Sequence, residues 1–218
     1  MNENEIVPRL LDYVRGEHTE EALLIGWICL LAHSLFLPVL SFVPALGYLV
    51  SVMRATLDEE PTLPPVSPRS LLSDSVAAST ICLLYGAIPL AVGTITISLV
   101  TETTIDPAGS GSILFLTGST VTLFVVLVGL YVLPIALCAY AGGGVRDTVP
   151  DRSFLTVGTN AAYFIGWTSA VLILAAGWLF GGVVEFVPVL GAIFAPLVWW
   201  IVLLIATRRL AAAYEAAR

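Results

Sequence analysis

The chain has 218 residues, of which 58% are hydrophobic and 11% are charged, and its formal net charge is −7. All nine basic residues are arginines, and the acidic excess argues against a nucleic acid partner. Acid-rich polar segments with arginine in place of lysine favour a protein from a very salty cytoplasm, although a high genomic GC content would also enrich arginine.

Five long stretches contain no Asp, Glu, Lys or Arg, and together they hold most of the chain. They are residues 22–53, 75–101, 107–145, 153–184 and 186–207. About 20 apolar residues are enough for one helix to cross a hydrocarbon core of roughly 30 Å. The stretches are apolar on all sides, whereas a soluble helix would keep a polar face and a barrel strand would alternate. The sequence therefore predicts an all-α integral membrane protein.

The first 21 residues are predicted to form a cytoplasmic tail that lies on the membrane surface. Its apolar side chains Ile6, Leu10, Tyr13 and Val14 fall near one helical face. A frayed extension of the first membrane segment is the alternative. The start of the chain has no positively charged region leading into an apolar run, so it is not predicted to be a secretory signal.

The first apolar stretch is too long for one upright span, at about 48 Å as a helix, and too short for two full spans. A repeated pattern indicates a hairpin. Ile25-Gly26-Trp27 precedes residues 42–47, with the sequence FVPALG, and Ile165-Gly166-Trp167 precedes residues 186–191, with the sequence FVPVLG. The second copy must contain a turn between two spans, and the first copy is interpreted in the same way, with turns at Pro44 and Pro188.

The arginines support this topology, because short cytoplasmic loops carry the excess of basic residues. A hairpin at residues 22–53 places all nine arginines on the inner side, whereas a single span would place Arg9 and Arg15 outside. Arg54, at the end of the short second segment, is expected to reach toward the lipid headgroups. The prediction is a multi-pass protein of the cell membrane with both termini cytoplasmic. Its membrane domain, residues 22–210, holds six segments in three hairpins, approximately 22–41, 44–57, 75–100, 112–140, 161–184 and 188–207, and residues 211–218 form a cytoplasmic tail.

Several short motifs are shared with a known family. They are Leu10-Leu11-Asp12-Tyr13, Gly47-Tyr48-Leu49-Val50 with Met53-Arg54, Leu63-Pro64, Leu133-Pro134-Ile135-Ala136-Leu137 and Val187-Pro188-Val189-Leu190-Gly191. By these motifs the chain resembles a family of archaeal, often haloarchaeal, polytopic membrane proteins known as domain of unknown function 4013. The resemblance implies an integral membrane protein without an assigned biochemical activity.

Small residues predict close helix packing in the fifth segment. Gly166, Ala170, Gly177 and Gly181 share one helical face, which would let another backbone approach closely. Pro89 and Pro134 should kink their helices, and neighbouring helices must then compensate the freed backbone groups. A lining for a pore is the alternative interpretation of these features.

Candidate chemical groups are few. His33 is an ionisable residue inside an apolar stretch and could have a proton or ligand role, but a neutral histidine bonded to a helix carbonyl is the simpler interpretation. Residues 141–148 contain three glycines but lack the Gly-Lys-Ser/Thr ending of a phosphate loop, so a helix stop is favoured. Cys29, Cys82 and Cys138 lack metal-ligand spacing. No catalytic, metal or cofactor site is predicted.

These features favour a membrane scaffold or accessory subunit over an enzyme, with a small-solute transporter or channel subunit as the alternative. The expected partners are the lipid bilayer and another membrane protein or a second copy of the chain. The acidic connector at residues 58–61 and the arginine-bearing loop at residues 146–152 are the expected contact surfaces.

Overall fold

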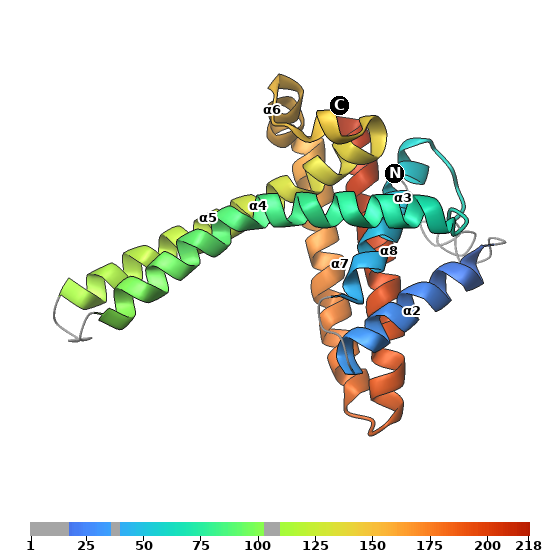
Figure 1. Ribbon diagram of the computed structural model, residues 1–218, viewed down its shortest axis with the longest axis horizontal. Helices are drawn as coiled ribbons and strands as arrows, with labels where there is room; N and C mark the ends of the chain where they lie inside the picture. Colours follow the sequence, from blue (N-terminus) through green and yellow to red (C-terminus); the bar gives the residue numbers. More distant parts are fainter. Residues whose placement is uncertain (1–17, 36–39, 103–109) are drawn as a thin grey trace.

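The computed structural model describes residues 18–35, 40–102 and 110–218 (Figure 1). Within these ranges the chain forms seven α-helices and one short 3-10 helix, and no strand is present, which confirms the all-α prediction. The helices are α2 (Thr19–Leu35), α3 (Phe42–Leu57), α4 (Pro68–Glu102), α5 (Ser110–Gly143), the 3-10 helix η1 (Val145–Thr148), α6 (Arg152–Thr159), α7 (Ala161–Glu185) and α8 (Leu190–Ala217). The amphipathic tail predicted over residues 1–21 lies almost wholly outside the described residues.

Four of these helices are long and apolar enough to cross a membrane. They contain the ranges Pro68–Ser98, Phe115–Gly143, Ala161–Glu185 and Leu190–Ala217. Helix α3 is apolar but shorter, with 16 residues. The predicted count of six membrane segments therefore stays a prediction.

The first apolar stretch is divided between two helices, α2 and α3, which contact each other. The two prolines predicted at hairpin turns differ in position. Pro44 lies in the first turn of α3, where its missing N–H costs no helical hydrogen bond, whereas Pro188 lies in the turn between α7 and α8. Gly191 follows that turn, and a Cβ at this position would overlap the carbonyl oxygen of Val184. The turn thus depends on glycine.

Helices α4 and α5 form a long hairpin. They have 35 and 34 residues, which corresponds to about 50 Å each at 1.5 Å per residue. Figure 1 shows them side by side and at a steep angle to the α7 and α8 pair, with α4 changing direction part-way along its length. Helix α4 starts at Pro68, seven residues before the predicted segment, because proline fits the first turn of a helix.

Helices α7 and α8 form an antiparallel hairpin that is in contact along its length (Figure 1). Helix α8 continues as one helix through most of residues 211–218, the region predicted to be a tail. Ala211, Ala213 and Ala217 of this region are buried against the rest of the molecule.

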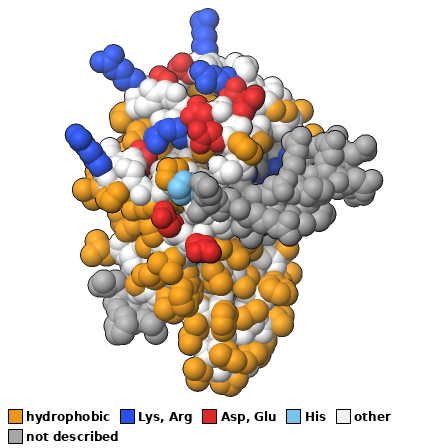
Figure 2. All heavy atoms as spheres, turned by 90° about the vertical axis from the view of Figure 1, so that its right-hand side faces the viewer, with side chains coloured by type: hydrophobic (Ala, Val, Ile, Leu, Met, Phe, Trp, Pro, Cys, Tyr) orange, Lys and Arg blue, Asp and Glu red, His pale blue; other side chains and the backbone are white. Residues whose placement is uncertain are grey.

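The buried core has two parts. The larger part is formed by α3, α6, the inner end of α4 and the C-terminal end of α5. The start of α7 and the end of α8 complete it. The smaller one surrounds Trp200, which is fully buried and donates its indole N–H to the carbonyl of Ala22 at 2.9 Å. Figure 2 shows the charged side chains gathered over one end of the molecule and hydrophobic side chains over the other.

Candidate functional site

An ion pair with a buried carboxylate joins α3 to α4. The guanidinium of Arg54 donates to the carboxylate of Asp74 through two parallel contacts, Nη1 to Oδ2 at 2.8 Å and Nη2 to Oδ1 at 3.1 Å. The Asp74 side chain is 5% exposed, whereas the Arg54 side chain is 38% exposed and keeps some contact with the surroundings. This fork geometry is the stronger form of an arginine and carboxylate pair.

Three further hydrogen bonds complete the cluster around this pair. The hydroxyl of Tyr140 donates to Oδ1 of Asp74 at 3.0 Å, and the hydroxyl of Ser51 makes a longer contact of 3.5 Å to Oδ2. The Nε of Arg54 donates to the carbonyl of Ala141 at 3.2 Å. The cluster therefore ties α3, α4 and α5 together at one point.

A close approach of α3 and α4 brings Asp74 within hydrogen-bond distance of Arg54. A Cβ on Gly47 would overlap Oγ of Ser75 and would lie 2.7 Å from the carbonyl oxygen of Leu71. Only glycine at this position lets α4 come so near to α3. The short distance brings Asp74, one residue before Ser75, within reach of Arg54.

The polar groups of this cluster join helices and have little capacity for catalysis or ligand binding. Each oxygen of Asp74 already accepts two hydrogen bonds, so the carboxylate has little capacity left to take a proton or bind a ligand. The pair contributes to stability mainly through the penalty for removing Arg54, because the buried Asp74 carboxylate would then be left without a compensating charge. The cluster acts as a clamp on three helices.

Sequence reasoning missed Asp74. The predicted membrane segment begins at residue 75, whereas α4 begins at Pro68 and includes Asp74 in its second turn. Arg54 was expected to reach toward lipid headgroups, but it turns to Asp74 and to a backbone carbonyl. One signal in the sequence could have indicated this pair: Asp74 directly precedes the apolar stretch 75–101, and Arg54 directly follows the apolar stretch 22–53.

A second cluster forms where α5 contains Pro134. Proline has no N–H, so the carbonyl of Leu130, four residues earlier, loses its helical donor. The indole N–H of Trp167 in α7 donates to this carbonyl at 3.2 Å. The hydroxyl of Tyr163 donates to the carbonyl of Tyr131 in the same turn at 3.0 Å. As expected, a neighbouring helix provides a donor for the carbonyl that Pro134 leaves without its helical hydrogen bond.

A similar contact involves the other tryptophan of the sequence repeat. Trp27 in α2 donates its indole N–H at 2.7 Å to the carbonyl of Ile193, in the α8 turn that precedes Pro196. The preceding glycines also face helix α8: a Cβ on Gly26 would overlap Trp200, and one on Gly166 would overlap the Cβ of Ala213. The second halves of the two copies differ, since residues 42–47 lie within α3 and residues 186–191 include a turn.

The predicted packing residues Gly166, Ala170, Gly177 and Gly181 lie on the buried face of α7. Three of them face side chains of α8. A Cβ at Gly177 would overlap Val202, and one at Gly181 would lie 2.9 Å from Trp199, in addition to the Ala213 contact at Gly166. Small side chains here allow α7 and α8 to approach closely.

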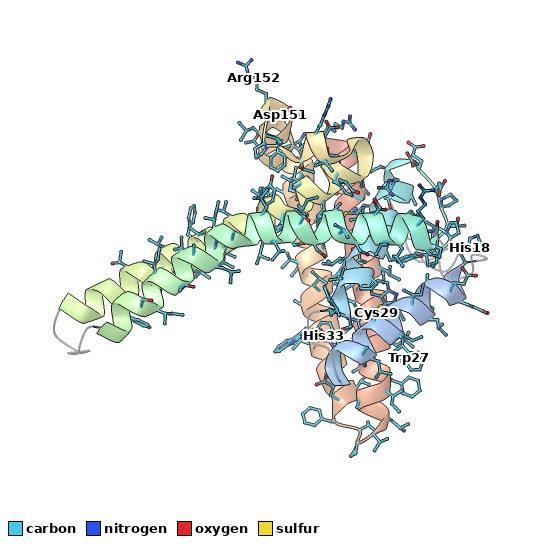
Figure 3. All side chains as sticks on the ribbon, viewed as in Figure 1. His18, Trp27, Cys29, His33, Asp151 and Arg152 are labelled. Carbon is cyan, nitrogen blue, oxygen red and sulfur yellow. The ribbon has the colours of Figure 1, made fainter. Side chains whose placement is uncertain are left out.

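The weaker candidates lie apart from these clusters. His33 is exposed near the end of α2, and its ring lies 5.9 Å from that of Phe42 (Figure 3). Gly144 has a φ of 95° and ends α5, as expected for a helix stop. Among the residues that the structure describes, no group of three or more His, Cys, Asp or Glu side chains could hold a metal ion.

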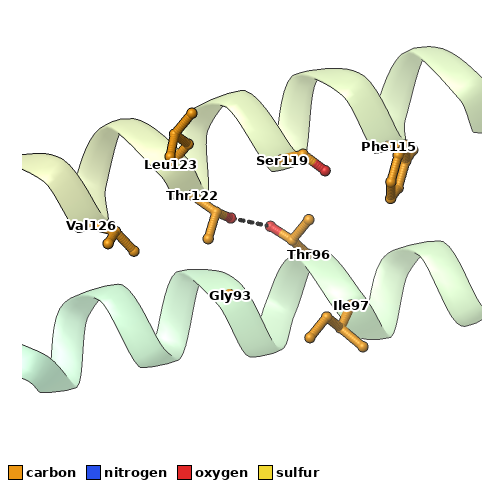
Figure 4. Close-up of a pocket in the computed structure, with 8 residues that line it drawn as sticks. All are labelled: Gly93, Thr96, Ile97, Phe115, Ser119, Thr122, Leu123 and Val126. Carbon is orange, nitrogen blue, oxygen red and sulfur yellow. Dashed lines mark hydrogen bonds between the residues drawn. The ribbon is translucent and has the colours of Figure 1, made fainter. Parts of the chain in front are cut away.

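An open groove of about 560 Å³ lies between α4 and α5, far from the ion pair (Figure 4). A hydrogen bond of 3.1 Å between the hydroxyls of Thr96 and Thr122 crosses it. Its lining is mostly apolar and carries no charge, which gives it little capacity to guide an ion. The lining residues are Gly93, Thr96, Ile97, Phe115, Ser119, Thr122, Leu123 and Val126.

The helices and clusters define an all-helical protein with the features of an integral membrane protein and with polar groups used to join helices. A family model described as protein of unknown function (DUF4013) matches residues 30–189, which is well over half of the chain. The chain therefore belongs to this family, and the resemblance seen in the sequence is confirmed. No curated protein matches the chain. No solved structure matches it either.

Proposed function

We propose that this protein is a membrane scaffold or accessory subunit, multi-pass in the cell membrane with both termini cytoplasmic, and that it has no catalytic site of its own. The observation that supports this most is the use of its polar groups. Asp74 accepts hydrogen bonds from Arg54 and Tyr140, and the indole N–H groups of Trp27 and Trp167 donate to backbone carbonyls. Such groups stabilise a bundle and leave its charged end as the surface for a partner.

The distribution of arginine supports the orientation. Arg208 donates to the backbone carbonyls of Glu60 and Pro61, which brings the end of α8 to the connector between α3 and α4. Arg146 and Arg152 lie between α5 and α7, at the same end of those helices. The turn at the opposite end of α7 carries Glu185 and no arginine. The excess of arginine on one side is typical of cytoplasmic loops.

Two exposed surfaces at this end are suited to a partner. The acidic connector exposes Glu59 and Glu60, and its backbone is held by Arg208, so the acidic side chains are presented on a fixed segment. The loop before α7 exposes Arg146 and Arg152, and Figure 3 shows Arg152 pointing away from the helices. Both surfaces are charged, which favours electrostatic recognition of another protein.

The proposal includes the origin of the protein, which we place in an archaeal cell with a high-salt cytoplasm. The lysine-free composition and the net charge of −7 support it. Thermal unfolding of the purified protein at increasing KCl tests it: the melting temperature should keep rising up to molar salt. A maximum at ordinary ionic strength would contradict the high-salt origin.

The test of function is gentle extraction of the protein from native membranes at high salt, followed by mass spectrometry of the intact particle. We expect a stoichiometric partner that is lost in the variant Glu59→Gln with Glu60→Gln, since these changes remove two charges and keep the carbonyls that bind Arg208. Glu185→Gln, at the opposite end, is the control. A particle without a partner that moves solutes into vesicles would support the transporter alternative and contradict the scaffold.

A further inference from the structure

The α4 and α5 hairpin has an inner half and an outer half that differ in burial. The inner half contains buried residues of both helices, such as Asp74, Ala78, Ile135 and Cys138. We call residues 82–98 of α4 and 115–130 of α5 the outer arm, and none of these residues is buried. In α5 the change from one half to the other falls at the turn that contains Pro134.

This turn is a weak point of α5. The ring of Pro134 removes the hydrogen bond to the Leu130 carbonyl and strains the preceding turn. Sharp bends in helices occur mostly at prolines. In an apolar environment the freed carbonyl strongly favours any neighbour that can donate a hydrogen bond, because water is absent.

Helix α7 supplies two such donors one turn apart. Trp167 reaches the Leu130 carbonyl and Tyr163 reaches the Tyr131 carbonyl, at 3.2 and 3.0 Å. The ring of Tyr131 lies edge-on to both rings, with centroid distances of 5.2 Å. Its hydroxyl donates to the carbonyl of Gly158 in α6 at 2.8 Å. The turn is therefore held from both α6 and α7.

The other helix of the arm is restrained differently at its own proline, because the hydroxyl of Tyr85 in α4 donates to the carbonyl of Thr148 in η1 at 2.8 Å. Pro89 of α4 frees the carbonyl of Tyr85, and among the described residues no side chain is found to donate to it. Pro89 also packs against α5, since a Cβ on Gly129 would lie 3.3 Å from its Cγ. The two helices are thus coupled near their prolines. Among the described residues, side chains from outside the hairpin donate to the carbonyls of the proline turn only in α5, whereas α4 is held through the hydroxyl of its own Tyr85.

We propose that Tyr163 and Trp167 form a latch on the proline hinge of α5, and that this latch fixes the direction in which the outer arm leaves the bundle. When the latch opens, the arm swings about the Pro134 turn while the inner half stays fixed by Arg54 and Asp74. The direction of the arm affects how the protein fits a membrane, because in Figure 1 the arm extends away from α7 and α8 at a steep angle to them. Helices that cross one bilayer lie within about 40° of its normal, so the direction of the arm decides how both hairpins fit the membrane.

The test measures distances between paired spin labels in the full-length protein in lipid nanodiscs, with the three native cysteines replaced by alanine. One pair, Leu123→Cys on the arm and Leu172→Cys on α7, reports on the arm. A second pair, Leu72→Cys and Leu172→Cys, reports on the inner half. All three label sites are exposed.

The variant Trp167→Phe with Tyr163→Phe removes two donors and keeps the aromatic rings. We expect it to shift and broaden the distance distribution of the arm pair and to leave the inner pair unchanged. Trp178→Phe, at an exposed tryptophan of the same helix, is the control and should change neither. Adding Pro134→Ala to the double variant restores the N–H donor to Leu130, and this should return the arm distribution toward that of the parent protein.

An unchanged arm distribution in the double variant would overturn the proposal. A shift that Pro134→Ala fails to reverse would also overturn it, because the movement would then not depend on the proline hinge. A shift of both label pairs together would indicate general loosening of the bundle, which contradicts a latch that acts on the arm alone.

Discussion

The hairpins α7–α8 and α4–α5 are similar in hydrophobicity and differ in how they pack. In α7, Gly166 and Gly177 let α8 approach along the hairpin. In the described parts of α4 and α5, buried residues lie only in the inner half, near the Arg54 and Asp74 pair. The outer arm has no buried residue, although the two helices approach closely where Gly118 faces Thr96. The comparison shows that hydrophobicity selects a helix for the membrane, whereas residue size and paired polar groups decide which helices associate.

The largest effect is expected from breaking the inner end of the α4–α5 hairpin. Arg54→Met leaves the Asp74 carboxylate, which is 5% exposed, without its charged partner, and we expect the free energy of unfolding to fall by about 2–4 kcal/mol. Unfolding in mixed detergent micelles measures this. Replacing both residues, as Arg54→Met with Asp74→Leu, should recover most of the loss, since no uncompensated charge remains.

The exposed residue Glu215 provides a matched control for this prediction. Glu215→Gln should change the free energy of unfolding by less than about 0.5 kcal/mol, as surface substitutions usually do. A loss for Arg54→Met no larger than this would show that the ion pair does not hold the three helices together.

The next effect concerns the close contact within the α7–α8 hairpin. Gly166→Ala places a methyl group against the Cβ of Ala213, and we expect a loss of about 1–3 kcal/mol from overpacking. A Cβ added at Gly182, on the same helix, would have no other atom within 4 Å, so Gly182→Ala should stabilise the helix by up to about 1 kcal/mol. Thermal melts should show a lower melting temperature for Gly166→Ala and a higher one for Gly182→Ala. Equal shifts would show that Gly166 is not required for close packing of α7 against α8.

A smaller effect is expected in the outer arm. Thr122→Val removes the hydroxyl contact to Thr96, and a side-chain hydrogen bond between membrane helices contributes about 0.6 kcal/mol on average. Thr94→Val is the control, because the Thr94 hydroxyl donates to the carbonyl of Leu90 within its own helix. If the two variants behave alike in the same unfolding assay, the hydroxyl pair does not join α4 to α5.

The smallest effect is expected at α6, which links the two hairpins. The hydroxyl of Ser153 and the backbone N–H of Phe154 donate to the Asp151 carboxylate, and they lower the pKa of that carboxyl below its usual value. Because the folded-state pKa is the lower one, the cap contributes fully above the unfolded-state pKa and is lost as the pH falls through the folded-state pKa. Amide hydrogen exchange at Phe154 should therefore become faster in that acidic range.

Asparagine can cap a helix without titrating, so Asp151→Asn is the informative variant. We expect it to remove the acid dependence of exchange at Phe154, after correction for the intrinsic rate, while the helix start stays protected at neutral pH. An acid dependence that persists unchanged in Asp151→Asn would assign it to another group.

Much of the fold could be predicted because it depends on local composition. Long apolar stretches predicted helices, and the small residues of α7 lie against α8 as their spacing indicated. The ends of the elements were less predictable. Helix α4 starts before its apolar stretch and α8 continues beyond its own, because packing of Asp74 and of the alanines near the end of α8 extends the helices into polar sequence.

The sequence by itself determined the helical class, the family, and the segregation of arginine, since these follow from residue type and from spacing along one helix. Only the tertiary structure decided which polar groups meet. Arg54 and Asp74 are 20 residues apart, and Trp167 and Leu130 are 37 apart. Whether such groups face each other depends on how two helices are rotated and how closely they approach, and a pattern along either helix alone does not specify this.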